Sequence, residues 1–483
     1  MGDQADAHQS LQQGRGSSHK QLSLVFLVGR SIAGRQRRRK QAQSLTCCRK
    51  RPIRCGIPSP APIEFGQAKT HSVKIAASHL PLCQRALRAV VDVAVSGVFM
   101  LFPILLLSAA GFTVLTTEFI IVGLLPSIAR DLDVSVSQAG LLVTLFAFTV
   151  AVFGPFLTAY FARFQRKRLF ICILIMFALA NTVAALAPNI WVMALARLIP
   201  ALGLPVFWAL ASETAVDIVG PEFAGRAIEK IGFGIVCATV FGIPVGTLIS
   251  DMFGWRTAFA ILAVVALAKA LLLFIYLPVT TPKNDQVSLR SQFKTLRSPL
   301  MQGHILLSIL VFSGMFTAYT YLADILERLA GFDGTLVGWC LMGFGAVGLI
   351  GNALGGRAVD RHPLIASMVF CGFMIAGMVA VVPAIHSSIG LAAAMAVWGV
   401  TQAAMFLVSH VRLMKAAPHA PAFAASLNIA GANLGIGLGA MVGGHVIDTL
   451  GLASLGFAAS GFILVSILLA LWLMTVKPMP ARA

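Results

Sequence analysis

The stretch GIVCATVFGIPVGTLISDMFG at residues 234–254 recurs in outline as GANLGIGLGAMVGGHVIDTLG at residues 431–451. The matching positions of the first stretch are Gly234, Ala238, Gly242, Gly246, Asp251 and Gly254. Those of the second stretch are Gly431, Gly435, Gly439, Gly443, Asp448 and Gly451. Residues four apart share a helix face, and a face of Gly and Ala lets another helix approach closely within a membrane. All six pairs have the same separation (431 − 234 = 197), so we interpret the chain as a duplicated unit whose halves pack on matching helices.

The composition indicates a membrane protein. The 483 residues are 58% hydrophobic and 11% charged, and the mean hydropathy is +0.86. Soluble globular proteins carry about 25% charged residues. No run alternates apolar and polar residues over the length that a membrane β-barrel needs. We therefore predict an all-α integral membrane protein.

Residues 1–95 differ from the rest of the chain. They hold 16 of the Lys and Arg residues and 4 of the Asp and Glu residues, so they contribute +12 to the total charge of +19. Because no hydrophobic periodicity is sustained there, we expect a disordered basic extension. Three interpretations stay open: a solvated arm on anionic lipid, an Arg-rich transit peptide, or upstream sequence absent from the native protein. We favour the last, because no Met lies between Met1 and Met100. The extension has few aromatic residues to stack on bases, so we expect no nucleic-acid partner.

Apolar runs recur at regular spacing from residue 99 onwards. A helix needs about 20 apolar residues to cross the hydrocarbon core. The predicted spans are 99–126, 138–160, 168–187, 190–213, 227–250, 256–278, 300–328, 335–358, 364–383, 389–413, 422–447 and 452–476. They form two pseudo-symmetric bundles of six transmembrane helices, at 99–278 and 300–476, joined by a cytoplasmic linker at 279–298.

The loops on the two sides of the membrane carry unequal positive charge. With the N-terminus inside, the inner loops and the C-terminal tail hold sixteen Lys and Arg residues, Arg412 and Lys415 among them. The outer loops hold only Arg130, Arg256 and Arg328. The positive-inside rule then places both termini in the cytoplasm. An odd number of helices would break this pattern, so the charges favour twelve.

Two sets of six helices around a polar linker resemble the major facilitator superfamily. The segments GFTVLTTEFIIVGLLPSIARDL (111–132) and FGIPVGTLISDMFGWRTAF (241–259) look like the first and fifth helices of its arabinose-efflux-permease-like branch of drug and sugar:proton antiporters. The segments TYLADILERLAGF (320–332) and GLIGNALGGRAVDR (348–361) look like the seventh and eighth. The resemblance implies two halves that rock around a solute site near the middle of the membrane.

Two short segments resemble the family's loop signature, TAYFARFQRK at 158–167 and GRAVDRHP at 356–363. In the family this loop is a latch that holds the inner side shut, and the resemblance extends that role to these loops. The gating candidates are Arg163, Arg166, Lys167, Asp217, Gly356, Asp360 and Arg361. The first copy lacks the family's acid, so for Arg166 and Lys167 we favour membrane orientation alone. For Asp360 and Arg361 we give equal weight to a latch role and to membrane orientation alone. We expect Glu213 and Asp217 to meet the basic loop at 163–168.

The fifth predicted helix departs from the common exporter signature, in which Gly-Pro is followed two residues on by Gly-Gly. Here the pattern is Gly242-Ile-Pro244-Val-Gly246. Pro244 removes a backbone hydrogen bond and permits a bend. The helix-packing candidates are Gly234, Gly242, Pro244, Gly246, Gly431, Gly435, Gly439 and Gly443.

Glu118 is the candidate for proton coupling, with Arg197 as its partner. Glu118 is the one ionisable residue of the first predicted span, and charges at membrane depth are costly and usually face protein or water. Glu118 lies eight residues before Pro126, and Arg197 lies seven residues after Ile190. At about 1.5 Å per residue their depths match, which allows an ion pair. A permanent structural pair that never titrates is an equally weighted alternative.

The resemblance assigns the solute cavity to the first, fourth, seventh and tenth helices. The candidates for substrate binding are Trp208, Tyr319, Trp398, Gln402 and Met405. In the tenth helix Trp398, Gln402, Met405 and Ser409 share one face. An aromatic or Met stripe is usually packing, whereas a buried amide needs hydrogen-bond partners. We expect Lys269 to be a snorkelling or helix-packing residue.

These features predict a secondary transporter rather than an enzyme. No nucleotide loop, zinc spacing or hydrolase elbow is present, so we expect no cofactor or metal. The resemblance implies proton-coupled efflux of a small organic solute, drug or sugar-like, by alternating access. The alternatives are a sugar or metabolite facilitator without proton coupling and a membrane solute sensor that transports nothing. We expect a monomer in the cell inner membrane whose partners are the solute, protons and lipid.

Overall fold

The structure is a computed structural model that describes residues 80–220, 224–279, 298–417 and 421–475. Within these ranges, twelve helical segments are long and apolar enough to cross a membrane. The predicted number of spans is therefore confirmed. The extension at residues 1–79 and nearly all of the linker at 279–298 lie outside the described residues.

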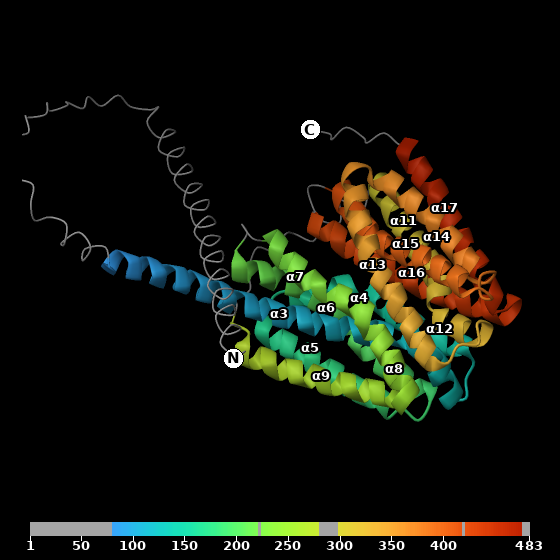
Figure 1. The fold of residues 1–483 in the computed structure, drawn as a ribbon, viewed down its shortest axis with the longest axis horizontal. Helices are drawn as coiled ribbons and strands as arrows, with labels where there is room; N and C mark the ends of the chain where they lie inside the picture. The colour runs from blue at the N-terminus through green and yellow to red at the C-terminus, as the bar shows by residue number, and fades with distance from the viewer. Residues whose placement is uncertain (1–79, 221–223, 280–297, 418–420, 476–483) are drawn as a thin grey trace, which may run out of the picture. The chain divides into compact units, whose positions relative to one another are not determined.

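Each half of the protein contains six spans (Figure 1). The elements of the N-terminal half are α3 (Leu80–Asp131), α4 (Val136–Phe161), α5 (Arg166–Ala185), α6 (Ile190–Val219), α7 (Ala224–Cys237), η2 (Ala238–Gly242), α8 (Ile243–Phe253) and α9 (Trp255–Tyr276). Those of the C-terminal half are α11 (Pro299–Tyr319), α12 (Leu322–Asp324), η3 (Ile325–Leu329), α13 (Gly334–Arg361), α14 (Pro363–Val381), α15 (Ser388–Ala416), α16 (Pro421–Leu450), η4 (Leu452–Ser454) and α17 (Leu455–Thr475).

The first helix is longer than predicted at both ends. It begins at Leu80, so residues 80–95 are helical where we expected disorder. The segment LPLCQRALRAVV at 80–91 is rich in Leu, Ala and Arg, which are strong helix formers. At the other end the helix continues past Pro126 to Asp131. Its membrane-spanning part is Phe102–Asp131.

The fifth span is interrupted where the sequence predicts a bend. The π-helical segment η2 ends at Gly242, two residues before Pro244. Proline lacks the N–H that an α-helical hydrogen bond requires, and π-helical turns often occur where the regular ladder is disturbed. The span therefore consists of α7, η2 and α8 in succession.

The repeated glycines pack against the first helix of their own half in the same register. A Cβ at Gly242 would lie 2.9 Å from Cγ2 of Thr116 on α3. A Cβ at Gly439 would lie 2.9 Å from the backbone nitrogen of Thr317 on α11. Gly439 also packs against Ser313 of α11, which is the counterpart of Thr116 (313 − 116 = 197). The predicted close-packing role of these glycines is seen in both halves, at positions one repeat apart.

Two contacts between the halves join a residue to its own counterpart. The rings of Phe119 and Phe316 stack with centroids 5.9 Å apart (316 − 119 = 197). Arg130 and Glu327 form an ion pair and are also 197 residues apart. A residue that touches its equivalent lies close to the axis that relates the halves. The structure thus has the pseudo-two-fold relation expected of a duplicated bundle.

Three of the described hydrogen bonds between the halves lie at one end of the helices, and a fourth, Thr144–Gly437, lies deeper in the bundle. This end, where α3, α8 and α16 finish, is named the closed end; the end where α5 and α14 begin is named the opposite end. The contacts are Arg130–Glu327, Ser137–Asp448, Thr144–Gly437 and Thr335–Asp251. A pocket bordered by both halves also lies at the closed end.

Large apolar side chains cover the outward surface of the bundle. Trp191, Phe156, Val264 and Leu468 are each more than 60% exposed. In the spans of α9 and α17, only 39% and 33% of the most apolar stretch of 18 residues is buried inside the protein. Such a surface suits hydrocarbon chains, because lipid rather than water contacts it.

Candidate functional site

Arg197 of α6 is buried and binds the backbone of α3 beside Glu118. Its Nη2 donates to the carbonyl oxygen of Glu118 at 2.6 Å, and its Nη1 donates to the carbonyl oxygen of Thr117. The guanidinium carbon lies 4.6 Å from the ring centroid of Phe146 on α4. Thr117 also accepts a hydrogen bond from Asn181 of α5 at 3.2 Å. Four helices of the N-terminal half therefore meet in one polar layer.

The Glu118 carboxylate takes no part in these hydrogen bonds. The residue is 7% exposed, and among the described residues no hydrogen bond or ion pair reaches its side-chain oxygens. The structure thus brings Glu118 and Arg197 together, but through a carbonyl group and not through the predicted carboxylate–guanidinium pair.

The four candidates for substrate binding in the C-terminal half form one cluster. Trp398 donates from Nε1 to Oε1 of Gln402 at 2.8 Å. The Tyr319 ring stacks on Phe344 at 5.4 Å and lies 6.5 Å from Trp398. Met405, which lies three residues after Gln402 on α15, is fully buried. The Gln402 carbonyl is thus already bonded within its own helix, and Phe344 is a member that sequence reasoning missed.

Trp208 belongs to α6 of the N-terminal half. It packs in the N-terminal half, where a Cβ at Gly111 of α3 would lie 2.8 Å from its ring. Its ring also contacts Phe207 edge to face, with centroids 5.8 Å apart. The structure therefore places Trp208 on the opposite half from the other four candidates, and the contacts described for it are packing contacts.

Arg166 of α5 is buried and joined to α6. Its Nη2 bonds to the Glu213 carboxylate at 2.8 Å, and its Nη1 bonds to the carbonyl oxygen of Ala162 at 2.6 Å. The expected meeting of Glu213 with the basic loop is confirmed, and Asp217 lies one turn further along α6. Arg166 is more than an orientation charge, because its side chain is only 3% exposed.

The other gating candidates also contact residues of their own half. Arg163 lies over the Tyr160 ring at 4.1 Å, and Lys167 lies over Phe274 at 5.7 Å. In the C-terminal half Lys415 bonds to the carbonyl oxygens at the end of α13 and lies 3.7 Å from the Asp360 carboxylate. Gly356 has room around it, since a Cβ there would lie 3.6 Å from Leu407, and Arg361 is exposed.

Lys269 holds α9 against α3. Its Nζ donates to Oγ1 of Thr113 at 2.6 Å and to the carbonyl oxygen of Ala109. The ammonium group also lies 5.0 Å from the centroid of the Phe112 ring. The predicted helix-packing role is confirmed.

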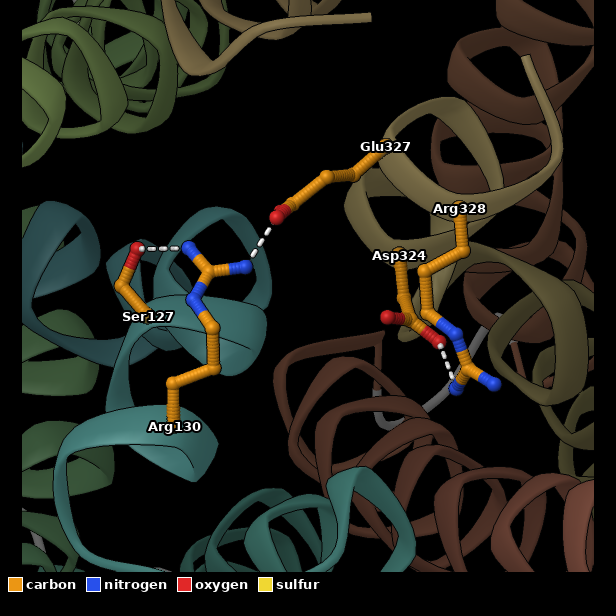
Figure 2. Close-up of polar contacts among 5 residues, drawn as sticks. All are labelled: Ser127, Arg130, Asp324, Glu327 and Arg328. Carbon is orange, nitrogen blue, oxygen red and sulfur yellow. Dashed lines mark hydrogen bonds and ion pairs between the residues drawn. The ribbon is translucent and has the colours of Figure 1, made fainter. Parts of the chain in front are cut away.

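Sequence reasoning missed the polar contacts at the closed end. Figure 2 shows Arg130 of α3 reaching across to Glu327 of η3, while Asp324 pairs with Arg328 inside the C-terminal half. Two further bonds cross between the halves, from Ser137 to Asp448 at 2.8 Å and from Thr335 to Asp251 at 2.6 Å. Asp251 and Asp448 are the acids that end the two glycine repeats. Their shared position was the sequence signal that could have identified these contacts.

Removing the acids that bridge the closed end should open it. Exposed hydrogen bonds and ion pairs contribute about 0.5 kcal/mol each, so Asp251→Ala, Asp448→Ala and Glu327→Ala together should shift the ratio of closed to open forms by roughly tenfold. The measurement is the maleimide labelling rate of Ser127→Cys, because Ser127 lines the pocket at this end. Asp131→Ala is the control, since Asp131 pairs with Arg256 of its own half. Equal labelling rates in the triple variant and the parent would contradict this role.

The geometry defines a class of protein: a twelve-helix membrane bundle of two repeated halves, with buried charges inside the bundle and polar contacts that close one end. The family model of the Major Facilitator Superfamily matches residues 107–422 and 307–483. The chain belongs to the major facilitator superfamily.

Known proteins support the same assignment. The chain is 33% identical over 380 residues to "Uncharacterized MFS-type transporter YtbD" of Bacillus subtilis, covering 76% of this chain and 94% of the relative. It is 31% identical to "Probable sugar efflux transporter" of Pasteurella multocida, covering 73% and 87%. Among solved structures, a bacterial homolog of the human lysosomal transporter Spinster, in an inward-facing and unoccupied conformation, matches with a TM-score of 0.64 at 17% identity, covering 79% of this chain and 99% of that one. The chain is thus a multi-pass membrane transporter and not an enzyme.

Proposed function

We propose that this transporter exports a small organic solute in exchange for protons. The observation that carries the proposal is the Glu118 carboxylate, which is buried near the middle of the span Phe102–Asp131 without a described hydrogen-bond or ion-pair partner. A buried carboxylate without a fixed counter-ion can gain and lose a proton, and intramembrane acids commonly serve proton pathways. Arg197 of α6 bonds to the backbone carbonyl of Glu118, so the titrating carboxyl group lies beside a contact between two helices.

Alternating access is the mode that fits the distribution of contacts. The halves are bonded to each other at the closed end, whereas Arg166–Glu213 and Lys415–Asp360 at the opposite end stay within their halves. The positive charges of the loops favour the opposite end as the cytoplasmic one. In this proposal the closed end faces outward, and solute enters from the cytoplasm before the halves rock about the pseudo-two-fold axis.

The aromatic cluster of the C-terminal half is the candidate solute face. Tyr319, Trp398 and Gln402 offer rings for stacking and an amide for hydrogen bonds, which suits a sugar as well as a small amphiphile. The similarity to "Probable sugar efflux transporter" favours a sugar. A facilitator that moves the same solute without protons is the second candidate, and the experiment below separates the two.

Transport in liposomes that contain the purified full-length protein tests the proposal. With an acidic lumen, proton export should drive accumulation of a labelled sugar above its external concentration. An ionophore that collapses the proton gradient should abolish the accumulation. A panel of labelled sugars and cationic drugs, screened first by counterflow, identifies the solute class. Entry of solute to equilibrium, unaffected by the gradient, would establish a facilitator and overturn proton coupling.

A further inference from the structure

A second buried polar cluster lies in the C-terminal half, away from Glu118. Arg412 of α15 is 1% exposed. Its Nη1 meets Nδ1 of His304 at 3.2 Å, and its Nη2 donates to Oγ of Ser308 at 2.8 Å. Ser308 in turn donates to Oδ1 of Asn428 on α16 at 2.9 Å. The cluster therefore joins α11, α15 and α16.

No described acid neutralises this guanidinium. Arg412 takes part in none of the ion pairs found among the described residues, whereas Arg166, which is buried to a similar degree, pairs with Glu213. Burial of an ion costs several kcal/mol even after relaxation, and a charged partner is the usual compensation. The sequence interpretation of Arg412 as a loop charge is therefore wrong, and the side chain has only neutral partners.

Donor capacity is left over in the cluster. Nε of Arg412 is buried without a hydrogen-bond partner, and so is Oγ of Ser409, which lies three residues earlier on α15. Residues three apart share a helix face, so the two groups lie on the same side of α15. The edge of a guanidinium that carries Nε and one Nη is suited to pairing with both oxygens of a carboxylate.

The duplicated N-terminal half provides an internal comparison. One repeat earlier, at a separation of 197, the positions of His304, Ser308, Arg412 and Asn428 hold Leu107, Gly111, Ala215 and Ile231. Leu107, Ala215 and Ile231 are buried in an apolar core. A half of this architecture is thus stable with apolar residues at these positions. The polar cluster is not required by the fold, which favours a role in binding.

We propose that the Arg412 cluster binds the carboxylate group of a small organic anion. The two carboxylate oxygens bond to the free edge of the guanidinium and to Ser409, and the anion supplies the missing counter-charge. Arg412 lies four residues before the end of α15, and His304 lies five residues after the start of α11. At about 1.5 Å per residue the site is 6–8 Å inside the opposite end, so the anion enters from that end. This site goes beyond the proposed export function.

Thermal unfolding of the full-length protein in phosphatidylcholine nanodiscs tests the proposal without any transport. Sodium acetate replaces sodium chloride stepwise at constant ionic strength. The melting temperature should rise saturably by roughly 2–4 °C. The rise should be lost in Arg412→Gln and kept in Arg168→Gln, which removes an exposed charge at the same end of the bundle.

Arg412→Lys keeps the charge but not the planar fork, so it tests the geometry if Arg412→Gln does not fold. In Arg412→Lys, half of the maximal rise in melting temperature should require about tenfold more acetate than in the parent protein. The proposal is overturned if the parent protein shows no saturable rise, if Arg412→Gln shows the same rise as the parent, or if Arg412→Lys binds acetate with unchanged half-saturation. Because binding alone is measured, the outcome is independent of whether the protein exports its solute.

Discussion

Glu118→Gln should reduce proton-driven accumulation of solute to the level of empty liposomes while leaving counterflow exchange active. A carboxamide has nearly the same shape as a carboxyl group but cannot release a proton, so proton exchange at this position ends. The Arg197 contact should survive, because it is made to the carbonyl oxygen of residue 118 and not to its side chain. Solute binding and the rocking of the halves, which counterflow measures, should therefore remain.

Glu229→Gln is the matched control for this variant. Glu229 is an exposed acid on α7, so the same chemical change there should leave accumulation at the parental level. Accumulation by Glu118→Gln at the parental rate would exclude Glu118 as the coupling residue. Loss of counterflow in a variant with an unchanged melting temperature would assign Glu118 to solute binding instead of proton transfer.

The number of spans and the duplication could be predicted because the sequence shows both directly, as apolar runs and as a repeated spacing. Membrane thickness fixes the length of each apolar run. The packing of Gly242 on Thr116 and of Gly439 on its counterpart helix follows from one spacing that the sequence displays twice. The pairing of Arg130 with Glu327 obeys the same spacing and could have been found by looking for opposite charges 197 residues apart.

The direction of a side chain at the end of a helix was not predictable. Arg412 lies four residues from the end of α15, a distance that suits a loop charge and a buried charge equally well. Only the packing of α11 and α16 around it shows that it is buried.

Gly439→Ala should strongly destabilise the C-terminal half. The added methyl group would lie 2.9 Å from the backbone nitrogen of Thr317 and 3.1 Å from the carbonyl carbon of Phe316. Backbone atoms cannot rotate away, so α11 and α16 must separate, and overpacking of this kind costs about 1–3 kcal/mol. The larger Gly439→Val should abolish recovery of folded protein. The melting temperature of detergent-purified protein, followed by size-exclusion chromatography after heating, measures both effects.

The repeat supplies graded controls for this prediction. At the equivalent position Gly242→Ala would meet the Thr116 side chain, whose Cγ2 lies 2.9 Å away and can move by rotation about χ1, while its Cβ at 3.0 Å stays in place. Its melting temperature should therefore fall less than that of Gly439→Ala. Gly343→Ala and Gly461→Ala meet nothing within 4 Å, and alanine favours helix over glycine by about 0.5–1 kcal/mol, so neither should destabilise the protein. The fall in melting temperature should be largest for Gly439→Ala, smaller for Gly242→Ala and absent for Gly343→Ala. This order follows only if helix backbones touch at the glycine repeat, and an equal fall in all three variants would refute that contact.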